Sequence, residues 1–162
     1  ELLAVFGKLR ERITGLVLRT SLITGLPYED EDAFAELCDF LREVRIERAG
    51  VFPYSPEEGT PAALMPDRVD TAEAERRAEL VVDVQSEIMD EFNERRLGET
   101  LEVLCDGFDG QSMCYVGRSY AESPEIDGRI YFTADRDIEP GRFVNVRITG
   151  AMDGELTGEM EE

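Results

Sequence analysis

The spacing of apolar residues changes at Gly98, and this change limits the chain to a mixed fold. Before Gly98, apolar residues recur at three- and four-residue intervals, which is typical of helices, between short apolar runs. After Gly98, apolar and polar residues alternate, as they do in strands with one buried face. A chain of 162 residues has room for one domain or two small ones. We therefore predict an α/β part over residues 1–97 and an all-β domain over residues 98–162.

The all-β part contains five predicted strands, separated by Gly-containing turns such as Asp106-Gly and Asp127-Gly. The predicted ranges are Leu101–Cys105, Ser112–Tyr120, Arg129–Ala134, Arg142–Gly150 and Glu155–Glu159. Five strands in so short a segment suggest a closed, OB-like barrel, because closure removes exposed strand edges.

The α/β part alternates helical patterns with two apolar runs rich in β-forming residues. The predicted order is a helix over Glu1–Arg12, a strand over Leu16–Thr24, a helix opened by Glu29–Asp32, a strand over Ile46–Phe52 and a long helix from Asp70 to Gly98. The first strand has the composition of a parallel strand covered on both faces. Arg19 lies within it, and a buried cation is costly unless paired, so we expect Arg19 at a ligand site or in an ion pair.

Two acidic features mark helix starts. The run Glu29-Asp-Glu-Asp32 suits the positive end of a helix dipole better than a metal site, because sites for hard metals need carbonyls and spaced ligands. Asp70 and Glu73 resemble a capping box at the start of the long helix. The apolar stripe predicted for that helix is Ala74, Ala78, Val81, Val82, Ile88, Met89 and Phe92.

The second strand leads into a stiff loop, Gly50-Val-Phe-Pro-Tyr-Ser-Pro-Glu-Glu-Gly-Thr-Pro-Ala62. Its prolines fix φ and remove backbone donors, whereas Gly59 can adopt a positive φ. Ligand sites are often built at the carboxyl ends of strands in α/β layers. The loop is therefore either part of a binding site or only a tight connection to the next helix.

Charge and composition exclude several functions. The formal net charge is −20, and from Gly98 onward fifteen acids stand against five arginines. Binding to a phosphate backbone depends on clustered Lys and Arg, so nucleic acid is not the expected partner, and a protein partner should be basic. The chain has no His, which excludes Ser-His-Asp and Cys-His nucleophiles and His-based metal sites.

The three cysteines, Cys38, Cys105 and Cys114, are widely spaced and match no zinc or iron–sulfur pattern. We expect all three to be reduced and buried as small apolar side chains. No apolar run reaches the length of a membrane span and no leader pattern opens the chain, so we expect a cytoplasmic protein without a membrane partner.

Three motifs resemble the C-terminal half of the radical-SAM methylthiotransferases: Arg19-Thr-Ser-Leu-Ile-Thr-Gly-Leu-Pro27, Phe52-Pro-Tyr-Ser-Pro-Glu-Glu-Gly-Thr-Pro-Ala62 and Gly117-Arg-Ser-Tyr-Ala-Glu-Ser-Pro-Glu-Ile-Asp-Gly128. The third is similar to the branch that modifies a ribosomal protein rather than transfer RNA. Glu57 and Glu58 agree with this branch, since transfer-RNA members commonly have an Arg there. The family usually has Gly where this chain has Tyr28, so the turn after the first strand is a point of departure.

The resemblance implies part of a radical-SAM (β/α) barrel, followed by a long helix and a TRAM domain. It implies S-adenosylmethionine and two [4Fe–4S] clusters as cofactors of the intact enzyme. The implied reaction is β-methylthiolation of an aspartate in the twelfth protein of the small ribosomal subunit, with the acidic TRAM domain recognising this basic substrate. The implied cofactor-binding positions, which would line the cavity, are Arg19, Gly25, Tyr54, Ser55, Gly59 and Thr60.

The C-x-x-x-C-x-x-C motif that holds the radical-SAM cluster is absent from this chain. We therefore predict that the chain by itself is catalytically inactive and supplies no metal ligands or catalytic residues. Two alternatives remain. One is a transfer-RNA methylthiotransferase of the same family, and the other is a stand-alone acidic protein-binding module.

Overall fold

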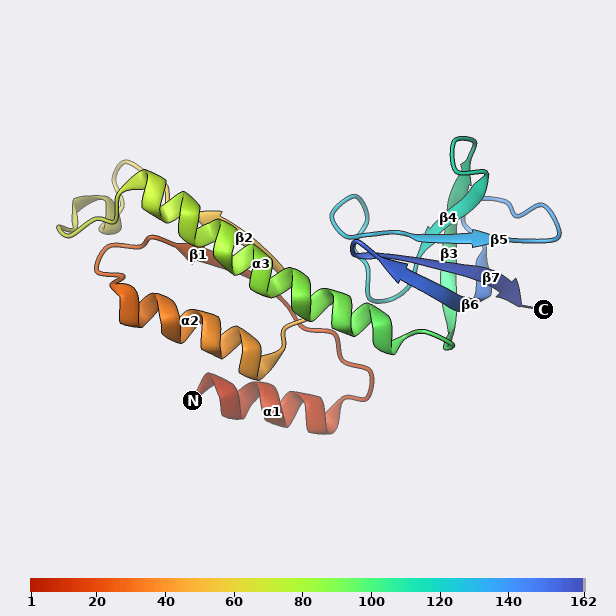
Figure 1. Cartoon of the computed structure of the whole chain (residues 1–162), viewed down its shortest axis with the longest axis horizontal. Coiled ribbons are helices and arrows are strands. Elements are labelled where there is room, and N and C mark those ends of the chain that lie inside the picture. Colours follow the sequence, from red (N-terminus) through yellow and green to blue (C-terminus); the bar gives the residue numbers. More distant parts are fainter. Residues whose placement is uncertain (162) are drawn as a thin grey trace. The chain divides into compact units, whose positions relative to one another are not determined.

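The computed structural model describes residues 1–161, and the chain divides into two compact units, Glu1–Ile88 and Met89–Glu162. Figure 1 shows the helices and a small sheet preceding a β-barrel in the chain. The elements are α1 (Leu2–Arg12), β1 (Arg19–Thr24), α2 (Glu31–Val44), β2 (Arg48–Pro53), the 3₁₀ helix η1 (Ala62–Leu64), α3 (Thr71–Arg95), β3 (Thr100–Asp109), β4 (Cys114–Arg118), β5 (Ile130–Thr133), β6 (Phe143–Met152) and β7 (Glu155–Glu161). The predicted combination of α/β elements with an all-β barrel is confirmed.

The first unit is built on a parallel pair of strands. β1 and β2 pair in register from Arg19 opposite Arg48 to Thr24 opposite Pro53. One face of this pair packs against α2 and α3, and the shared core is Leu18, Phe34, Cys38, Leu41, Val44, Ile46, Val81, Val84 and Ile88. The prediction that the first strand is covered on both faces is wrong, because Arg19, Ser21 and Ile23 are exposed.

Both ends of α2 are stabilised by contacts of residues at its termini. The Asp30 carboxylate accepts a hydrogen bond from the Ala33 backbone N–H at 2.9 Å, which satisfies one of the free donors of the first turn. At the other end, Arg45 takes the left-handed conformation with φ 54°, and its N–H donates to Leu41 O. Phe34, Leu41 and other residues at helical spacing are buried, as the pattern predicts.

α3 begins differently from the prediction. The Asp70 carboxylate accepts a hydrogen bond from the Ala72 N–H at 2.9 Å, and the Glu73 carboxylate binds Arg76 and Arg77. The reciprocal contact of a capping box is therefore replaced by ion pairs. Val81 is fully buried, whereas Val82 is 45% exposed, so the inclusion of Val82 in the buried stripe is wrong.

The second unit contains a closed barrel with the strand order β3-β4-β5-β7-β6. Four of the five strand pairs are antiparallel, and β5 pairs with β7 in parallel. The core is Val103, Cys105, Ile130, Phe132, Val146, Ile148 and Leu156. Closure leaves no strand of the barrel with an unpaired edge, which is the physical reason such short strands form a stable sheet.

The first barrel strand differs from its prediction. Asp106-Gly107 is not a turn but lies inside β3, where the register against β4 shifts between Cys105 and Gly107. Gly107 has φ 153°, a conformation suited to glycine, and the bulge bends the strand. β3 consequently continues to Asp109, and β4 is shorter than predicted, starting at Cys114.

Candidate functional site

The carboxyl ends of β1 and β2 lie at one end of the two-stranded sheet, and five of the six predicted site residues follow them in the chain, whereas Arg19 is at the amino end of β1. The Tyr54 N–H donates a hydrogen bond to Thr24 O at 2.8 Å, so the segments after the two strands leave from neighbouring points. Thr24 is fully buried, and its hydroxyl donates to Ala74 O at 3.0 Å. The start of α3 is thereby attached to the same end of the sheet.

Gly25 is held between this end of the sheet and α3. Its φ is 78°, and a Cβ at this position would stand 2.3 Å from Ala74 Cβ. Its N–H donates to the Glu29 carboxylate at 2.8 Å. Gly25 therefore permits close packing of the turn on α3. Tyr28 stands where the family usually has Gly. Its φ is 67°, so the backbone keeps the left-handed conformation that glycine favours despite the different residue.

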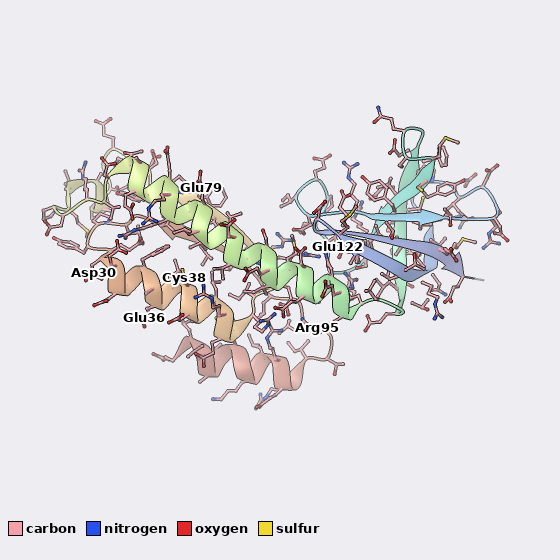
Figure 2. The ribbon with its side chains drawn as sticks, in the orientation of Figure 1. Asp30, Glu36, Cys38, Glu79, Arg95 and Glu122 are labelled. Carbon is pink, nitrogen blue, oxygen red and sulfur yellow. The ribbon has the colours of Figure 1, made fainter. Side chains whose placement is uncertain are left out.

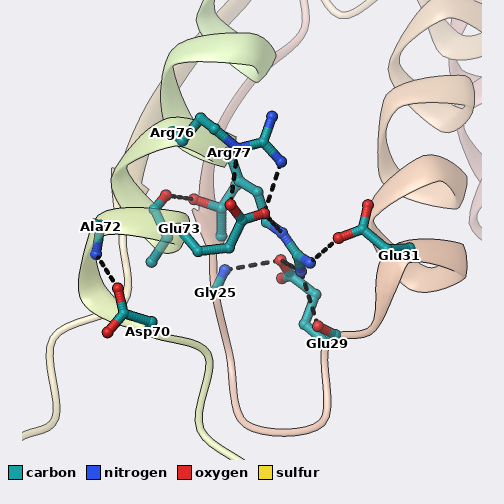
Figure 3. Close-up of polar contacts among 10 residues, drawn as sticks. Gly25, Glu29, Glu31, Asp70, Ala72, Glu73, Arg76 and Arg77 are labelled. Carbon is teal, nitrogen blue, oxygen red and sulfur yellow. Dashed lines mark hydrogen bonds and ion pairs between the residues drawn. The ribbon is translucent and has the colours of Figure 1, made fainter.

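A buried guanidinium organises the turn after β1 (Figure 3). Arg77 contacts the Glu29 carboxylate at 3.0 Å, Glu31 at 2.7 Å and Glu73 at 2.8 Å. It also donates to Glu29 O at 2.8 Å and lies over the Phe34 ring, with Cζ 5.2 Å from the ring centroid. Since Glu29 in turn holds the Gly25 N–H, Arg77 fixes the turn through Glu29.

The cluster shifts the proton affinities of its members in opposite directions. Burial lowers the pKa of Arg77, but the hydrogen bonds to Glu73, Glu29 and Glu31 outweigh it and raise that pKa. Hydrogen bonds from Arg76 and Arg77 lower the pKa of Glu73 to about 2. The acidic run at residues 29–32 is therefore more than a solvated first turn, because the Glu29 side chain is 9% exposed and paired.

The loop after β2 carries four of the predicted residues. The Tyr54 hydroxyl is buried and has no hydrogen-bond partner among residues 1–161, whereas Ser55 is exposed. Gly59 has φ 82° and open space around its Cβ position. The Thr60 hydroxyl donates to Glu57 O at 2.8 Å and accepts from the N–H of Ala63, a residue of η1, at 3.3 Å. Thr60 thus shapes the loop through its own hydroxyl.

Arg19 lies on the face of β1 that α2 and α3 do not cover. It alternates along the strand with partly buried residues, and Ile23 on the same face is 49% exposed. Phe52 of β2, which pairs with Ile23, is 56% exposed. This face of the sheet thus exposes Arg19 together with the apolar side chains of Ile23 and Phe52.

The third motif covers the last two residues of β4 and most of the segment leading to β5, where Figure 2 labels Glu122. The buried Glu122 carboxylate contacts Arg96 at 2.7 Å and accepts from the Ser119 hydroxyl at 2.6 Å and the Ser119 N–H at 2.9 Å. The Ser123 N–H donates to the Asp127 carboxylate at 2.6 Å. Burial raises the pKa of Glu122, but Arg96 and Ser119 outweigh this and lower it.

Two glycines place this segment close to neighbouring strands. A Cβ on Gly117 would lie 2.4 Å from Leu104 O, and one on Gly128 would lie 2.1 Å from Gly154 O. Beside the segment, the bulged part of β3 borders a groove of about 450 Å³. Its lining includes Phe108, Asp109, Arg118, Glu125 and Arg129.

Two of the three cysteines are buried in different hydrophobic cores. Cys38 lies in the core of the first unit and Cys105 in the barrel core, and burial raises the pKa of each thiol. Cys114 is half-buried, so the expectation of three buried cysteines is wrong for Cys114. Within residues 1–161, no three acidic or cysteine side chains gather as a metal site.

Comparison with known proteins agrees with the barrel. The family model described as TRAM domain matches residues 97–160, which span β3 to β7. The chain contains a TRAM domain. The predicted boundary at residues 97/98 stays a prediction, since the division of the chain into compact units falls within α3, between Ile88 and Met89.

Similarity to known proteins also extends beyond the TRAM domain to most of the chain. The chain is 44% identical over 156 residues to the ribosomal protein uS12 methylthiotransferase RimO of Desulforamulus reducens, covering 96% of this chain and 35% of the relative. The RimO of Clostridium botulinum strain Hall is 42% identical over 154 residues, covering 95% and 34%. That of Desulforudis audaxviator is 46% identical over 143 residues, covering 88% and 31%.

The resemblance predicted from the three motifs is thereby confirmed. The chain spans about a third of the length of these relatives, which are named as enzymes. No helix within residues 1–161 is long and apolar enough to cross a membrane.

Sequence reasoning missed two functional-looking features. Arg77 and Arg96 were not singled out, although both are buried and ion-paired: Arg77 lies on α3 among three carboxylates, and Arg96 directly follows α3 and pairs with Glu122. An arginine that interrupts the apolar face of a helix, as Arg77 does between Ala74 and Ala78, is the signal that could have identified it.

Proposed function

We propose that this chain is the part of a ribosomal-protein methylthiotransferase that follows the cluster-binding region. The proposed reaction places a methylthio group on the β-carbon of an aspartate of ribosomal protein uS12. The observation that carries this is the 44% identity over 156 residues to a uS12 methylthiotransferase. The charge agrees, because a net −20 attracts a basic protein and repels nucleic acid.

S-adenosylmethionine and two [4Fe–4S] clusters would supply the radical, sulfur and methyl chemistry. The cysteines of this chain do not fit the clusters, because Cys38 and Cys105 are buried in separate cores. We therefore assign the chain no catalytic step and expect it to be inactive by itself. The enzyme to which it would belong is expected to be cytoplasmic.

The proposed contribution of the first unit is one wall of the cofactor cavity. The six residues Arg19, Gly25, Tyr54, Ser55, Gly59 and Thr60 would line it or shape its loops. Two features support this. The uncovered face of β1 carries Arg19, and the buried Tyr54 hydroxyl lacks a protein partner within residues 1–161. A buried hydroxyl of this kind is available to a ligand.

The test uses the full-length protein that contains this chain, reconstituted with its clusters. Mass spectrometry should find a methylthio group on an aspartate of uS12 and none on transfer RNA. Methylthiolation of transfer RNA instead would favour the other branch of the family. No modification of either substrate, with tight binding of uS12 to the chain alone, would favour a stand-alone binding module.

A further inference from the structure

We infer that the groove beside the third motif receives an arginine or lysine side chain of the protein partner. The groove holds about 450 Å³ and lies between the bulged end of β3 and the segment from Glu122 to Arg129. This inference deepens the proposed function, since it names the surface of the TRAM domain that would contact basic uS12.

The groove has a fixed shape. Its outer wall is held by the buried contact of Glu122 with Arg96 at 2.7 Å and by two hydrogen bonds from Ser119. Gly117 and Gly128 keep the walls close to neighbouring backbone. The opposite wall follows the bulge, which redirects the side chains of β3. A preformed groove costs little ordering when a partner binds.

The charge of the lining suits a cation. Asp106, Asp109, Glu122, Glu125 and Asp127 stand against Arg118 and Arg129. Arg118 is ion-paired with Asp106, and Glu122 with Arg96. Glu125 is exposed and makes no hydrogen bond or ion pair with any residue from 1 to 161. Its carboxylate is thus available to a partner.

Phe108 supplies the second half of the site. Phe108 is 54% exposed and lines the groove, and its ring packs edge-on against Tyr115, with centroids 5.2 Å apart. An aromatic face beside carboxylates accommodates the apolar stem and the charged head of an arginine or lysine together. A phosphate would meet the same carboxylates with unfavourable charge, so the groove favours a protein over RNA.

The test measures binding of purified uS12 to the whole chain by calorimetry at low salt. Glu125→Gln should weaken binding about three- to tenfold, and Phe108→Ala about tenfold. Phe108→Leu keeps apolar packing on Tyr115 but should still weaken binding. Matched controls are Glu102→Gln and Phe143→Ala, exposed residues of the same barrel outside the groove, which should change binding less than about twofold.

The outcomes separate the groove from the proposed function. If uS12 binds and the groove variants bind as tightly as the controls, the groove assignment is overturned and the proposed function stands. If uS12 fails to bind, a short Arg-Gly repeat peptide is titrated instead. Groove-dependent peptide binding would keep the groove as a site for basic side chains, and no binding of either would overturn the inference, while methylthiolation of uS12 by the full-length protein decides the proposed function separately. Groove-dependent binding of transfer RNA would also overturn the inference.

Discussion

Arg77 is the residue on which the turn after β1 depends. It is 5% exposed and contacts Glu29, Glu31 and Glu73, which come from two separate parts of the chain. Removing one partner of a buried ion pair leaves the other charge without compensation, which costs more than the pair contributes.

We expect Arg77→Leu to lower the free energy of unfolding of the first unit by about 3–5 kcal/mol, because Glu29 would remain buried without its cation. Arg76→Leu is the matched control. Arg76 also binds Glu73 but is 54% exposed, so its loss should leave stability nearly unchanged. Urea unfolding followed by circular dichroism measures both. Equal effects of the two substitutions on the free energy of unfolding would contradict a stabilising role for the buried ion pairs of Arg77.

Glu122 makes the stability of the barrel depend on pH. Its pKa is lowered in the folded state from the ordinary value of 4.5, so the carboxylate contributes stability above that value. The contribution is lost as the pH falls through the folded pKa. Glu122→Gln should therefore be less stable at pH 7, by about 2 kcal/mol, and lose less stability on acidification.

The measurement is the urea concentration at the midpoint of unfolding, followed by the NMR resonances of barrel amides, at a series of pH values from 7 to below the ordinary pKa of 4.5. Glu102→Gln, which changes an exposed carboxylate of β3, should keep the full acid dependence of the unsubstituted protein. An acid dependence that is unchanged in Glu122→Gln would contradict the role given to the Arg96 contact.

At the level of elements, close packing of β1 on α3 requires glycine. Gly25 and Gly59 have nearly the same φ, 78° and 82°, but only Gly25 lies against another element. Gly25→Ala should cost about 2–4 kcal/mol, from the left-handed backbone and from overlap with Ala74. Gly59→Ala should cost only about 1 kcal/mol, from the backbone alone. Thermal unfolding of the two variants compares the costs.

If both glycine substitutions lower the melting temperature equally, the contact of Gly25 with Ala74 is not a packing constraint. Ala74 also makes a hydrogen bond with the end of β1. Thr24 donates to Ala74 O, so the first turn of the helix is attached to the end of the strand.

At the level of the whole molecule, the two units differ in how completely their strands are paired. Each strand of the two-stranded sheet has one partner, whereas every barrel strand has two. α1 has no buried residue. Backbone amides before about residue 60 should therefore exchange with solvent faster than those of the barrel strands. Hydrogen exchange measured by mass spectrometry tests this, and uniform protection across the chain would contradict it.

The local pattern of the sequence was sufficient for the elements. Alternation after Gly98 predicts the barrel, and the spacing of Phe34, Leu41 and Val44 predicts α2, because periodicity is a property of neighbouring residues. Net charge and the three motifs likewise required no coordinates, and they led to the confirmed resemblance.

Only the tertiary structure decided which faces are covered and which charges meet. Alternating exposure shows that one face of β1 is uncovered, although its composition resembles a buried strand. Arg77 meets Glu29, and Arg96 meets Glu122, across long stretches of chain. The sequence Asp106-Gly107 predicts a turn, but in the structure it forms a bulge within β3. Such features depend on which distant segments pack together, and a periodicity of two or 3.6 residues carries no information about them.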